Sequence, residues 1–434
     1  MTQKASEMIV FAPQPPNDFA RFYTLYYEEC RQRVPRIAAI AAKWRFEDLI
    51  PGLSDYDTRF ILDDGMTVQD WCDMSVAVGE VHLDLCRRYP HWARNLEHLP
   101  GINLTWTELT DPAMYYAEYP QWTFYRTEAP ARLTAAEQYL AGRPWDIQDQ
   151  YFHLKKFCLY YGRYDRQIDP PVNLREFESK YPLHSRFMHY FCPPLQSALC
   201  LLLQRPVAGK MESVRLACEM FPDPVFREMR DAVERHYEVP ELYGEPELTH
   251  LEDRLEAALE TLRRRLAPVV ADVVPEAGTK SLVQWKADLS RAPVSQAVRV
   301  FESARFSRLM KGRLQFYAHA PAHFDSTWPI ENELRRLKRS FFDVPFGTFW
   351  EMTTGETVRD PVAVVPQLVP ALLTAEEARC TLEFARLTPG HWAPGTQRQI
   401  ALDIAAVFDG FFHALNKVAQ AVSASEAGQQ MSSR

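Results

Sequence analysis

The sequence predicts an α+β fold in which an N-terminal α/β domain precedes a mainly α-helical C-terminal portion. Two segments with alternating polar and apolar residues, one around Asp57 and one ending at Glu108, have the period of β-strands. Elsewhere apolar residues recur at helical spacing, and 32 prolines against 16 glycines fit helices separated by proline-marked breaks. We therefore expect a small sheet near the N-terminus and helices after it.

The N-terminal part alternates between predicted helices and strands. Aromatic residues at helical spacing predict a helix after Asp18, and the apolar stretch from Ile37 to Ala42 leads to the strand around Asp57. Thr67 and Asp70 then have the spacing of a capping box, which predicts that the next helix begins there. The second alternating segment follows this helix.

Three domains are predicted along the chain. The first covers residues 1–130 and contains both alternating segments, and the second is helical and covers residues 131–267. The stretch 268–279 is the predicted boundary before a C-terminal helical domain at 280–424, because its prolines and glycine interrupt the helical pattern.

The composition is that of an ordinary globular chain, with 47% hydrophobic residues and a net charge of −8. Broad binding to nucleic acid draws its affinity from many Lys and Arg contacts to phosphate, so the acidic balance argues against it. No apolar run is long enough to cross a membrane, the N-terminus lacks the apolar segment of a signal peptide, and the eight cysteines are scattered singly. We expect a cytoplasmic protein with no membrane partner.

Asp55 and Asp57 occupy alternate positions where a loop enters the first predicted strand. Side chains of a strand point to opposite faces in turn, so these two carboxylates and Arg59 should share one face. Two anions so close repel each other unless a cation lies between them. Carboxylate oxygens suit hard cations such as Mg2+, so we predict a metal site here. The alternative is that the aspartates only form a turn.

The segment Gly52 to Asp57 reads Gly-Leu-Ser-Asp-Tyr-Asp and resembles the Ser-Asp-x-Asp element of the nucleotidyltransferase superfamily, which includes DNA polymerase beta and the antibiotic nucleotidyltransferases. The resemblance covers about the first third of the chain. In that family two aspartates hold divalent ions that bind a nucleoside triphosphate, and a third carboxylate on a later strand completes the site. The resemblance implies that Asp55, Asp57 and Glu108 bind Mg2+ and are catalytic, with Gly52 and Ser54 beside the bound nucleotide.

Two features of the chain differ from the family pattern. The family carries a Gly-Ser pair that grips phosphate before the aspartates, and the corresponding stretch from Ile40 to Arg45 has none. The third acid of the family is usually Asp. Antibiotic-modifying members also have helices that supply basic groups to the triphosphate, and by this analogy Lys155, Lys156 and Arg163 are the candidate phosphate-binding residues. The alternative is a solvated basic helix face.

Gly209-Lys210 is the other pair that could indicate phosphate binding. A phosphate-binding loop requires an earlier glycine, separated from this pair by four residues, and a Ser or Thr after it, and the chain has Gln204 and Met211 at those positions. The pair is therefore not predicted to form such a loop.

Three functions are compatible with these patterns. The first is a metal-dependent transferase in which Mg2+ neutralises a nucleoside triphosphate and a hydroxyl of a small-molecule acceptor attacks the α-phosphorus. The second keeps the fold but transfers a group from an aminoacyl-tRNA in a biosynthetic pathway, so tRNA would be the partner and triphosphate would not bind. The third is a non-catalytic helical binding protein with affinity for neither metal nor nucleotide.

Overall fold

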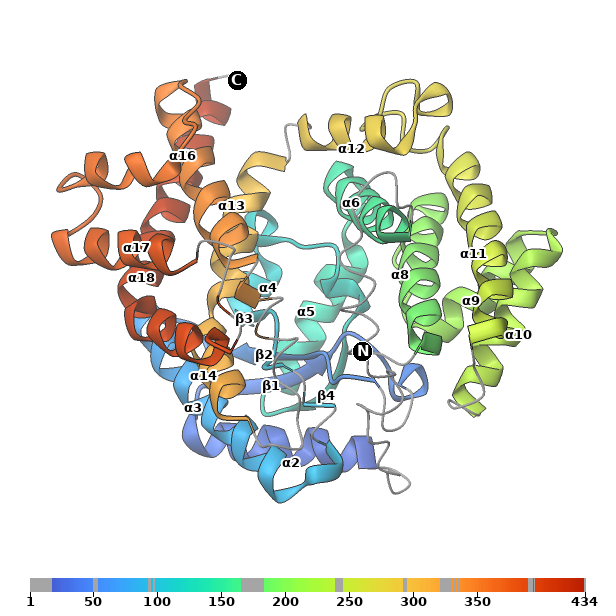
Figure 1. The fold of residues 1–434 in the computed structure, drawn as a ribbon, viewed down its shortest axis with the longest axis horizontal. Coiled ribbons are helices and arrows are strands. Elements are labelled where there is room, and N and C mark those ends of the chain that lie inside the picture. Colours follow the sequence, from blue (N-terminus) through green and yellow to red (C-terminus); the bar gives the residue numbers. More distant parts are fainter. Residues whose placement is uncertain are drawn as a thin grey trace.

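The computed structural model shows an α+β protein with a small mixed sheet near the N-terminus and helices over most of the remaining chain (Figure 1). The residues that it describes are 18–49, 54–92, 95, 96, 98–164, 183–238, 245–291, 295–320, 330, 333, 334, 336–388, 393 and 395–432. The fold class therefore agrees with the prediction from the sequence.

The sheet contains four strands in the spatial order β3-β2-β1-β4. They are β1 (Ile37–Ala42), β2 (Thr58–Leu62), β3 (Asn103–Thr105) and β4 (Thr123–Thr127). β1 is antiparallel to both β2 and β4, whereas β2 and β3 are parallel. Parallel neighbours need a crossover, and α3 (Val68–Arg88) lies in the connection between them. α3 begins with the predicted capping box of Thr67 and Asp70.

The strand register brings one end of each strand to the same edge of the sheet. Ala42 at the end of β1 pairs with Thr58 at the start of β2 and with Thr123 at the start of β4. Phe60 of β2 pairs with Asn103 at the start of β3. The residues that follow β1 and those that precede the other three strands therefore lie close together.

Helices cover both faces of the sheet. On one face, α2 (Asp18–Arg33) and α3 pack with Phe60 and Leu62 in the largest hydrophobic core. On the other face, Ile61 packs with side chains of α4 (Trp106–Thr110) and α5 (Pro130–Gly142). Neighbouring residues of β2 enter different cores because successive side chains of a strand point to opposite faces.

The middle of the chain forms a second, helical core, on the right in Figure 1. Its helices are α6 (Ile147–Tyr164), α8 (Leu183–Leu203), α9 (Lys210–Met220), α10 (Pro224–Glu238), α11 (Glu245–Leu266) and α12 (Leu282–Arg291). The C-terminal helices, on the left, share the largest core with α2, α3 and the sheet. They are α13 (Ser295–Ser307), α14 (Met310–His319), α16 (Val344–Thr354), α17 (Ala375–Leu387) and α18 (Gln397–Ser432). None of the helices in the described ranges combines the length and the apolar character that crossing a bilayer requires.

α14 packs against α3 through a glycine. A Cβ atom on Gly312 would lie 1.8 Å from the carbonyl oxygen of Ser75 in α3. The Gly312 backbone N–H also donates a hydrogen bond to Ser75 Oγ at 2.9 Å. The absence of a side chain at Gly312 is therefore what allows the C-terminal helices to approach the N-terminal part.

Candidate metal centre

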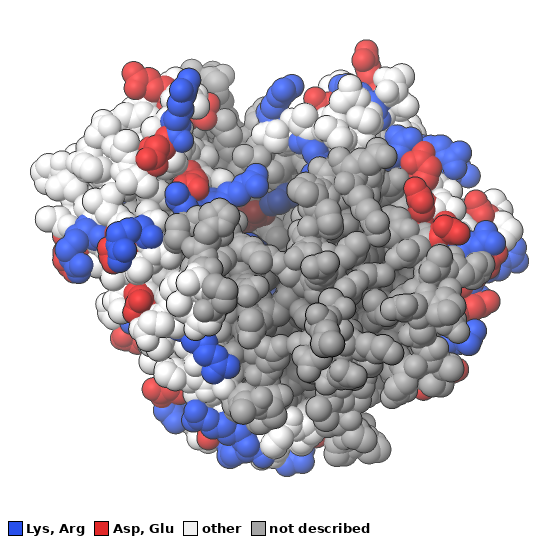
Figure 2. Space-filling model, viewed as in Figure 1, with Lys and Arg blue, Asp and Glu red and all other residues white. Residues whose placement is uncertain are grey.

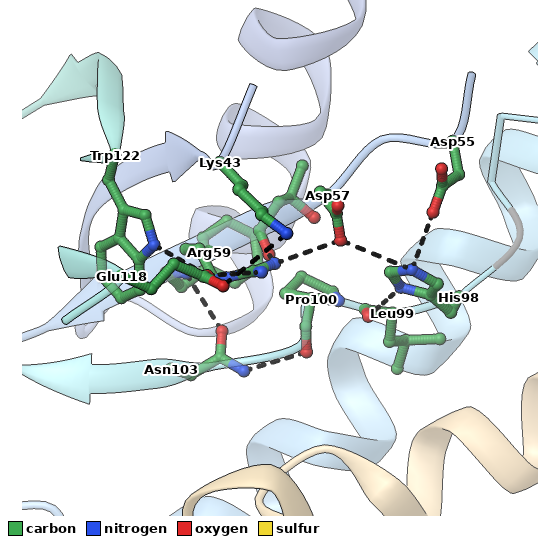
Figure 3. A network of polar contacts seen from close by, with 12 residues as sticks. Lys43, Asp55, Asp57, Arg59, His98, Leu99, Pro100, Asn103, Glu118 and Trp122 are labelled. Atoms are coloured by element: carbon green, nitrogen blue, oxygen red, sulfur yellow. Dashed lines mark hydrogen bonds and ion pairs between the residues drawn. The ribbon is translucent and has the colours of Figure 1, made fainter. Parts of the chain in front are cut away.

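Polar residues that are distant in the sequence meet at the edge of the sheet where β1 ends and the other strands begin (Figure 3). Lys43 follows β1, Asp55 and Asp57 precede β2, His98 precedes β3 and Glu118 precedes β4. The strand register brings them near one another, because each of them lies within a few residues of a strand end at this edge.

Asp55, Asp57 and His98 form a compact cluster in which one potential ligand atom of each lies within 4.8 Å of the others. His98 Nε2 is 3.1 Å from Asp55 Oδ2 and 3.7 Å from Asp57 Oδ1. His98 Nδ1 is 2.9 Å from the Leu99 carbonyl oxygen. A carbonyl oxygen only accepts hydrogen bonds, so Nδ1 carries a proton and Nε2 faces the two carboxylates.

The electrostatic environment favours a positive charge on His98. Burial lowers the pKa of this imidazole, but the hydrogen bond to Asp55 and the charges of Asp55 and Asp57 outweigh burial and raise it above 6.5. Two neighbouring carboxylates require a cation, and protonated His98 can supply it. The stability that this imidazolium contributes is fully present below pH 6.5 and is lost as the pH rises through the folded-state pKa.

Arg59 connects this cluster to a second carboxylate, that of Glu118. Its two terminal nitrogens lie 3.6 Å from Asp57 Oδ1 and 3.0 Å from Glu118 Oε1. Trp122 Nε1 donates a hydrogen bond to the same Glu118 oxygen at 3.1 Å. Arg59 and Glu118 are both buried, with 5% and 6% of their surface exposed. Figure 3 shows the result as a continuous row of side chains from Trp122 to Asp55.

Two lysines also approach Glu118. Lys43 Nζ and Lys156 Nζ lie 3.9 Å and 3.8 Å from Glu118 Oε2, Lys43 from the end of β1 and Lys156 from α6. Burial acts to raise the pKa of Glu118, but Arg59, Lys43 and Lys156 hold it well below its usual range. Among the described residues, Asp57 pairs with only one of these three cations, Arg59, so the surroundings of Glu118 carry an excess of positive charge when Lys156 is protonated.

Lys156 lacks the hydrogen bonds that a buried ammonium group normally makes. Its Nζ atom is buried and has no hydrogen-bond partner among the described residues, and the same holds for Arg59 Nε. Burial, together with the charge of Lys43, lowers the pKa of Lys156 to about 7. Buried donors without an acceptor destabilise a fold, and they are common where a ligand supplies the acceptor.

Replacing Lys156 with methionine should stabilise the protein by about 1 to 4 kcal/mol below pH 7, because it removes a buried charge while Arg59 and Lys43 still pair with Glu118. The folded-state pKa of about 7 lies below the usual 10.5, so between these values the unfolded chain binds more protons and the stability of the parent rises with pH. The gain should therefore shrink as the pH rises through this range.

Urea unfolding at several pH values measures this gain. Lys155→Met is the matched control. Lys155 directly precedes Lys156 in α6, and its side chain is 38% exposed in a pair with Glu302. A gain from Lys156→Met that does not change with pH, or one that Lys155→Met reproduces, would contradict the buried-charge explanation.

Of the other residues predicted to bind nucleotide, Ser54 lies next to the aspartates, Lys155 lies apart from this network, and Gly52 and the Arg163 side chain lie outside the described part. Lys155 Nζ pairs with Glu302 at 2.7 Å. The Ser54 carbonyl accepts a hydrogen bond from Asn95 at 2.6 Å, next to the aspartates. Gly52 lies outside the described residues, and Arg163 lies in α6 but its side chain is outside the described part.

Glu108 does not belong to the cluster of Asp55 and Asp57, whose third member is His98. The prediction that Glu108 ends a strand is wrong, because β3 stops at Thr105 and Glu108 lies in α4. Thr105 and Glu108 form a capping box, which is a pattern that begins a helix. Both oxygens of Glu108 also accept hydrogen bonds from Arg308, at 2.7 Å and 2.5 Å.

The Gly209-Lys210 pair contacts a carboxylate of the chain itself. The backbone N–H groups of Lys210 and Met211, at the start of α9, donate to Asp48 Oδ1 at 2.6 Å and 2.9 Å. Gly209 has a φ of +87°, and a Cβ atom there would lie 2.7 Å from Asp48 Oδ2. The helix N-terminus is thus capped by Asp48, in agreement with the prediction that the pair forms no phosphate-binding loop.

Sequence reasoning missed His98, Lys43 and Glu118. A signal for His98 exists, because parallel neighbouring strands begin at the same edge, so a polar side chain just before the second strand approaches the aspartates before the first. Comparisons of the chain with protein-family models, with curated proteins and with solved structures found no match. A functional conclusion therefore depends on the chemistry of the site.

Proposed function

We propose that this chain is a metal-dependent, nucleotidyltransferase-like transferase that uses a nucleoside triphosphate and a small-molecule acceptor. One observation carries this proposal: the cluster of Asp55, Asp57 and His98 lies beside the positively charged surroundings of Glu118 at one edge of the sheet. A divalent cation and a polyphosphate need these two kinds of environment side by side. Apart from β1, which lies between the helix and the aspartate pair, the order of helix, aspartate pair, strand, helix and further strand gives additional support, because the family resemblance predicts it.

The donor atoms of the cluster fit a divalent cation. Asp55 and Asp57 would hold Mg2+ through carboxylate oxygens, and His98 Nε2 faces the same point. When bound, the ion would neutralise triphosphate charge and stabilise the charge that develops during transfer. Asp55 or Asp57 would accept the proton of the acceptor hydroxyl, because these two carboxylates are partly exposed at the edge of the sheet.

The cations around Glu118 would bind and orient the phosphate groups. Lys156 Nζ and Arg59 Nε make no hydrogen bond among the described residues, and phosphate oxygens are strong acceptors. Basic and acidic side chains of the described residues are interspersed on the face shown in Figure 2. The net charge of −8 favours a small acceptor over a long nucleic acid.

Asp57→Asn should abolish the Mg2+-dependent binding of triphosphate and the transfer reaction while the fold stays intact, because a neutral amide is a much poorer Mg2+ ligand than a carboxylate. The melting temperature of the parent should rise with Mg2+ plus one of the nucleoside triphosphates, and that of the variant should not. Asp63→Asn is the matched control, because Asp63 is an exposed aspartate directly after β2.

The same measurements separate the three functions. A parent stabilised by Mg2+ but by none of the nucleoside triphosphates would favour the aminoacyl-tRNA-dependent alternative. A parent that Mg2+, Mn2+ and Co2+ all fail to stabilise, with or without nucleotide, would speak against the metal centre and favour a non-catalytic binding protein.

A further inference from the structure

The main chain holds the imidazole of His98 in one orientation. Its Nδ1–H donates to the Leu99 carbonyl at 2.9 Å, so Nε2 faces the carboxylates of Asp55 and Asp57. Histidines that bind metals usually donate their second ring nitrogen to a carbonyl or carboxylate, which fixes the tautomer and the ring orientation. His98 therefore has the contact that a metal-binding histidine needs.

The Leu99 carbonyl that orients His98 is held by the C-terminal helices. Arg313 of α14 donates to this carbonyl at 2.9 Å and pairs with Glu333 at 2.9 Å. The Glu333 side chain is buried, with 6% exposed, and the Arg313 side chain is only 11% exposed. The position of Nε2 is thus set by tertiary contacts and not by the loop alone.

The spacing of the three side chains suits a common metal ion. His98 Nε2 lies 3.1 Å from Asp55 Oδ2 and 3.7 Å from Asp57 Oδ1. Neighbouring ligand atoms lie about 3.0 Å apart in an octahedral site and about 3.4 Å apart in a tetrahedral one when metal–ligand bonds are about 2.1 Å long. The Asp55 and Asp57 oxygens lie within 4.8 Å of each other, so the two carboxylates must move closer together for all three donors to reach one ion.

A nitrogen donor changes which ions a site prefers. Mg2+ is bound mainly by oxygen ligands, whereas imidazole binds transition-metal ions well. We propose that Asp55, Asp57 and His98 form a metal centre in which His98 Nε2 binds the ion directly and selects transition-metal ions such as Co2+ and Mn2+ over Mg2+. This inference rests on the proposed function, since it concerns the same site, but its test requires neither nucleotide nor acceptor.

The competing role of His98 is that of an internal counter-ion, in which its imidazolium pairs with the carboxylates in place of a metal. The two roles predict opposite effects of His98→Gln. A lost ligand lowers the affinity for Co2+, whereas a lost counter-ion removes a competing positive charge from beside both carboxylates and raises the affinity for every divalent cation.

Calorimetric titration of the full chain with Co2+, Mn2+ and Mg2+ tests the inference. We expect His98→Gln to weaken Co2+ binding by at least about 10-fold, since loss of even an indirect partner of a metal ligand has effects of that size. Mg2+ binding should change much less. His91→Gln is the matched control, because His91 Nε2 also lies 3.1 Å from an aspartate oxygen, that of Asp18, away from this site.

Electron spin echo measurements detect nitrogen bound to Mn2+ in the parent itself. They therefore test the inference even if His98→Gln does not fold. Nitrogen coupling to Mn2+ should appear in the parent and in His91→Gln and disappear in His98→Gln. Absence of this coupling in the parent, or unchanged or tighter Co2+ binding by His98→Gln, overturns the inference. Metal binding through His98 without any affinity for nucleoside triphosphate overturns the proposed function and leaves the inference standing.

Discussion

Glu118→Gln should lower the free energy of unfolding by about 3 to 5 kcal/mol, because it removes the one carboxylate that all three buried cations approach. Arg59 pairs with Glu118 at 3.0 Å, and Lys43 and Lys156 approach its other oxygen at 3.9 Å and 3.8 Å. Glutamine keeps the shape of the side chain and removes its charge, so the loss measures electrostatics and not packing. Chemical unfolding of parent and variant at pH 7 gives the difference.

A surface ion pair supplies the control for Glu118→Gln. Glu80 pairs with Arg33 at 2.9 Å, and both side chains are more than half exposed. Glu80→Gln should cost less than about 1 kcal/mol, because water screens exposed pairs. Equal losses from both variants would mean that the surroundings of Glu118 are solvated and carry no excess positive charge.

A double variant isolates the interaction between the cations. Below the Lys156 pKa of about 7, Lys156→Met should stabilise the Glu118→Gln protein more than it stabilises the parent, because the shared anion no longer offsets the repulsion among Lys43, Lys156 and Arg59. Simple addition of the two effects would show that Lys156 and Glu118 are not coupled.

Gly312→Ala should destabilise the protein by about 3 kcal/mol, at the upper end of the range for overpacked cores. The added Cβ would lie 1.8 Å from the Ser75 carbonyl oxygen, and a backbone atom of a packed helix cannot move aside as a flexible side chain can. α14 would have to shift away from α3. Thermal and urea unfolding measure the loss.

Gly347→Ala is the matched control for Gly312→Ala. Gly347 lies in α16, and a Cβ atom there would meet Pro361 at 3.7 Å, which is an ordinary contact. Alanine is the better helix former by up to about 1 kcal/mol, so this variant should be neutral or stabilised. A similar loss from both variants would contradict a specific clash between α3 and α14.

The shift of α14 in Gly312→Ala should also disturb the candidate metal centre. Arg313 follows Gly312 in α14 and holds the Leu99 carbonyl that orients His98. If Gly312→Ala still folds at low temperature, its affinity for Co2+ should fall while that of Gly347→Ala stays unchanged. Unaltered Co2+ binding would show that the position of α14 does not influence His98.

Local signals were enough to predict much of the N-terminal part from the sequence. The helix after Asp18, the strand after Asp57 and the capping box at Thr67 depend on periodicity or on contacts within a few residues. The alternation Asp55, Asp57 and Arg59 also predicted a shared face, and Arg59 does approach Asp57 at 3.6 Å. These features need no knowledge of distant parts of the chain.

Glu108 shows where local patterns are ambiguous. The segment before it alternates like a strand, but its last four residues, Thr105 to Glu108, also match a capping box. In the structure this segment begins α4, and Arg308 from the C-terminal part donates hydrogen bonds to the Glu108 carboxylate. Arg308 and Glu108 are 200 residues apart in the sequence, so the local pattern around Glu108 could not predict this contact.

Only the tertiary structure decided which residues complete the site. Lys155 and Lys156 are chemically alike, but neighbours on a helix point about 100° apart, and packing of α6 turns Lys156 toward Glu118 and Lys155 toward Glu302. His98 and Glu118 join Asp57 because of strand order and register, which depend on pairing between distant segments. The sequence by itself determined the fold class and the aspartate pair, since short-range periodicity encodes them. The third potential ligand and the cations that approach Glu118 depend on how the sheet and helices assemble, because long-range packing sets those distances.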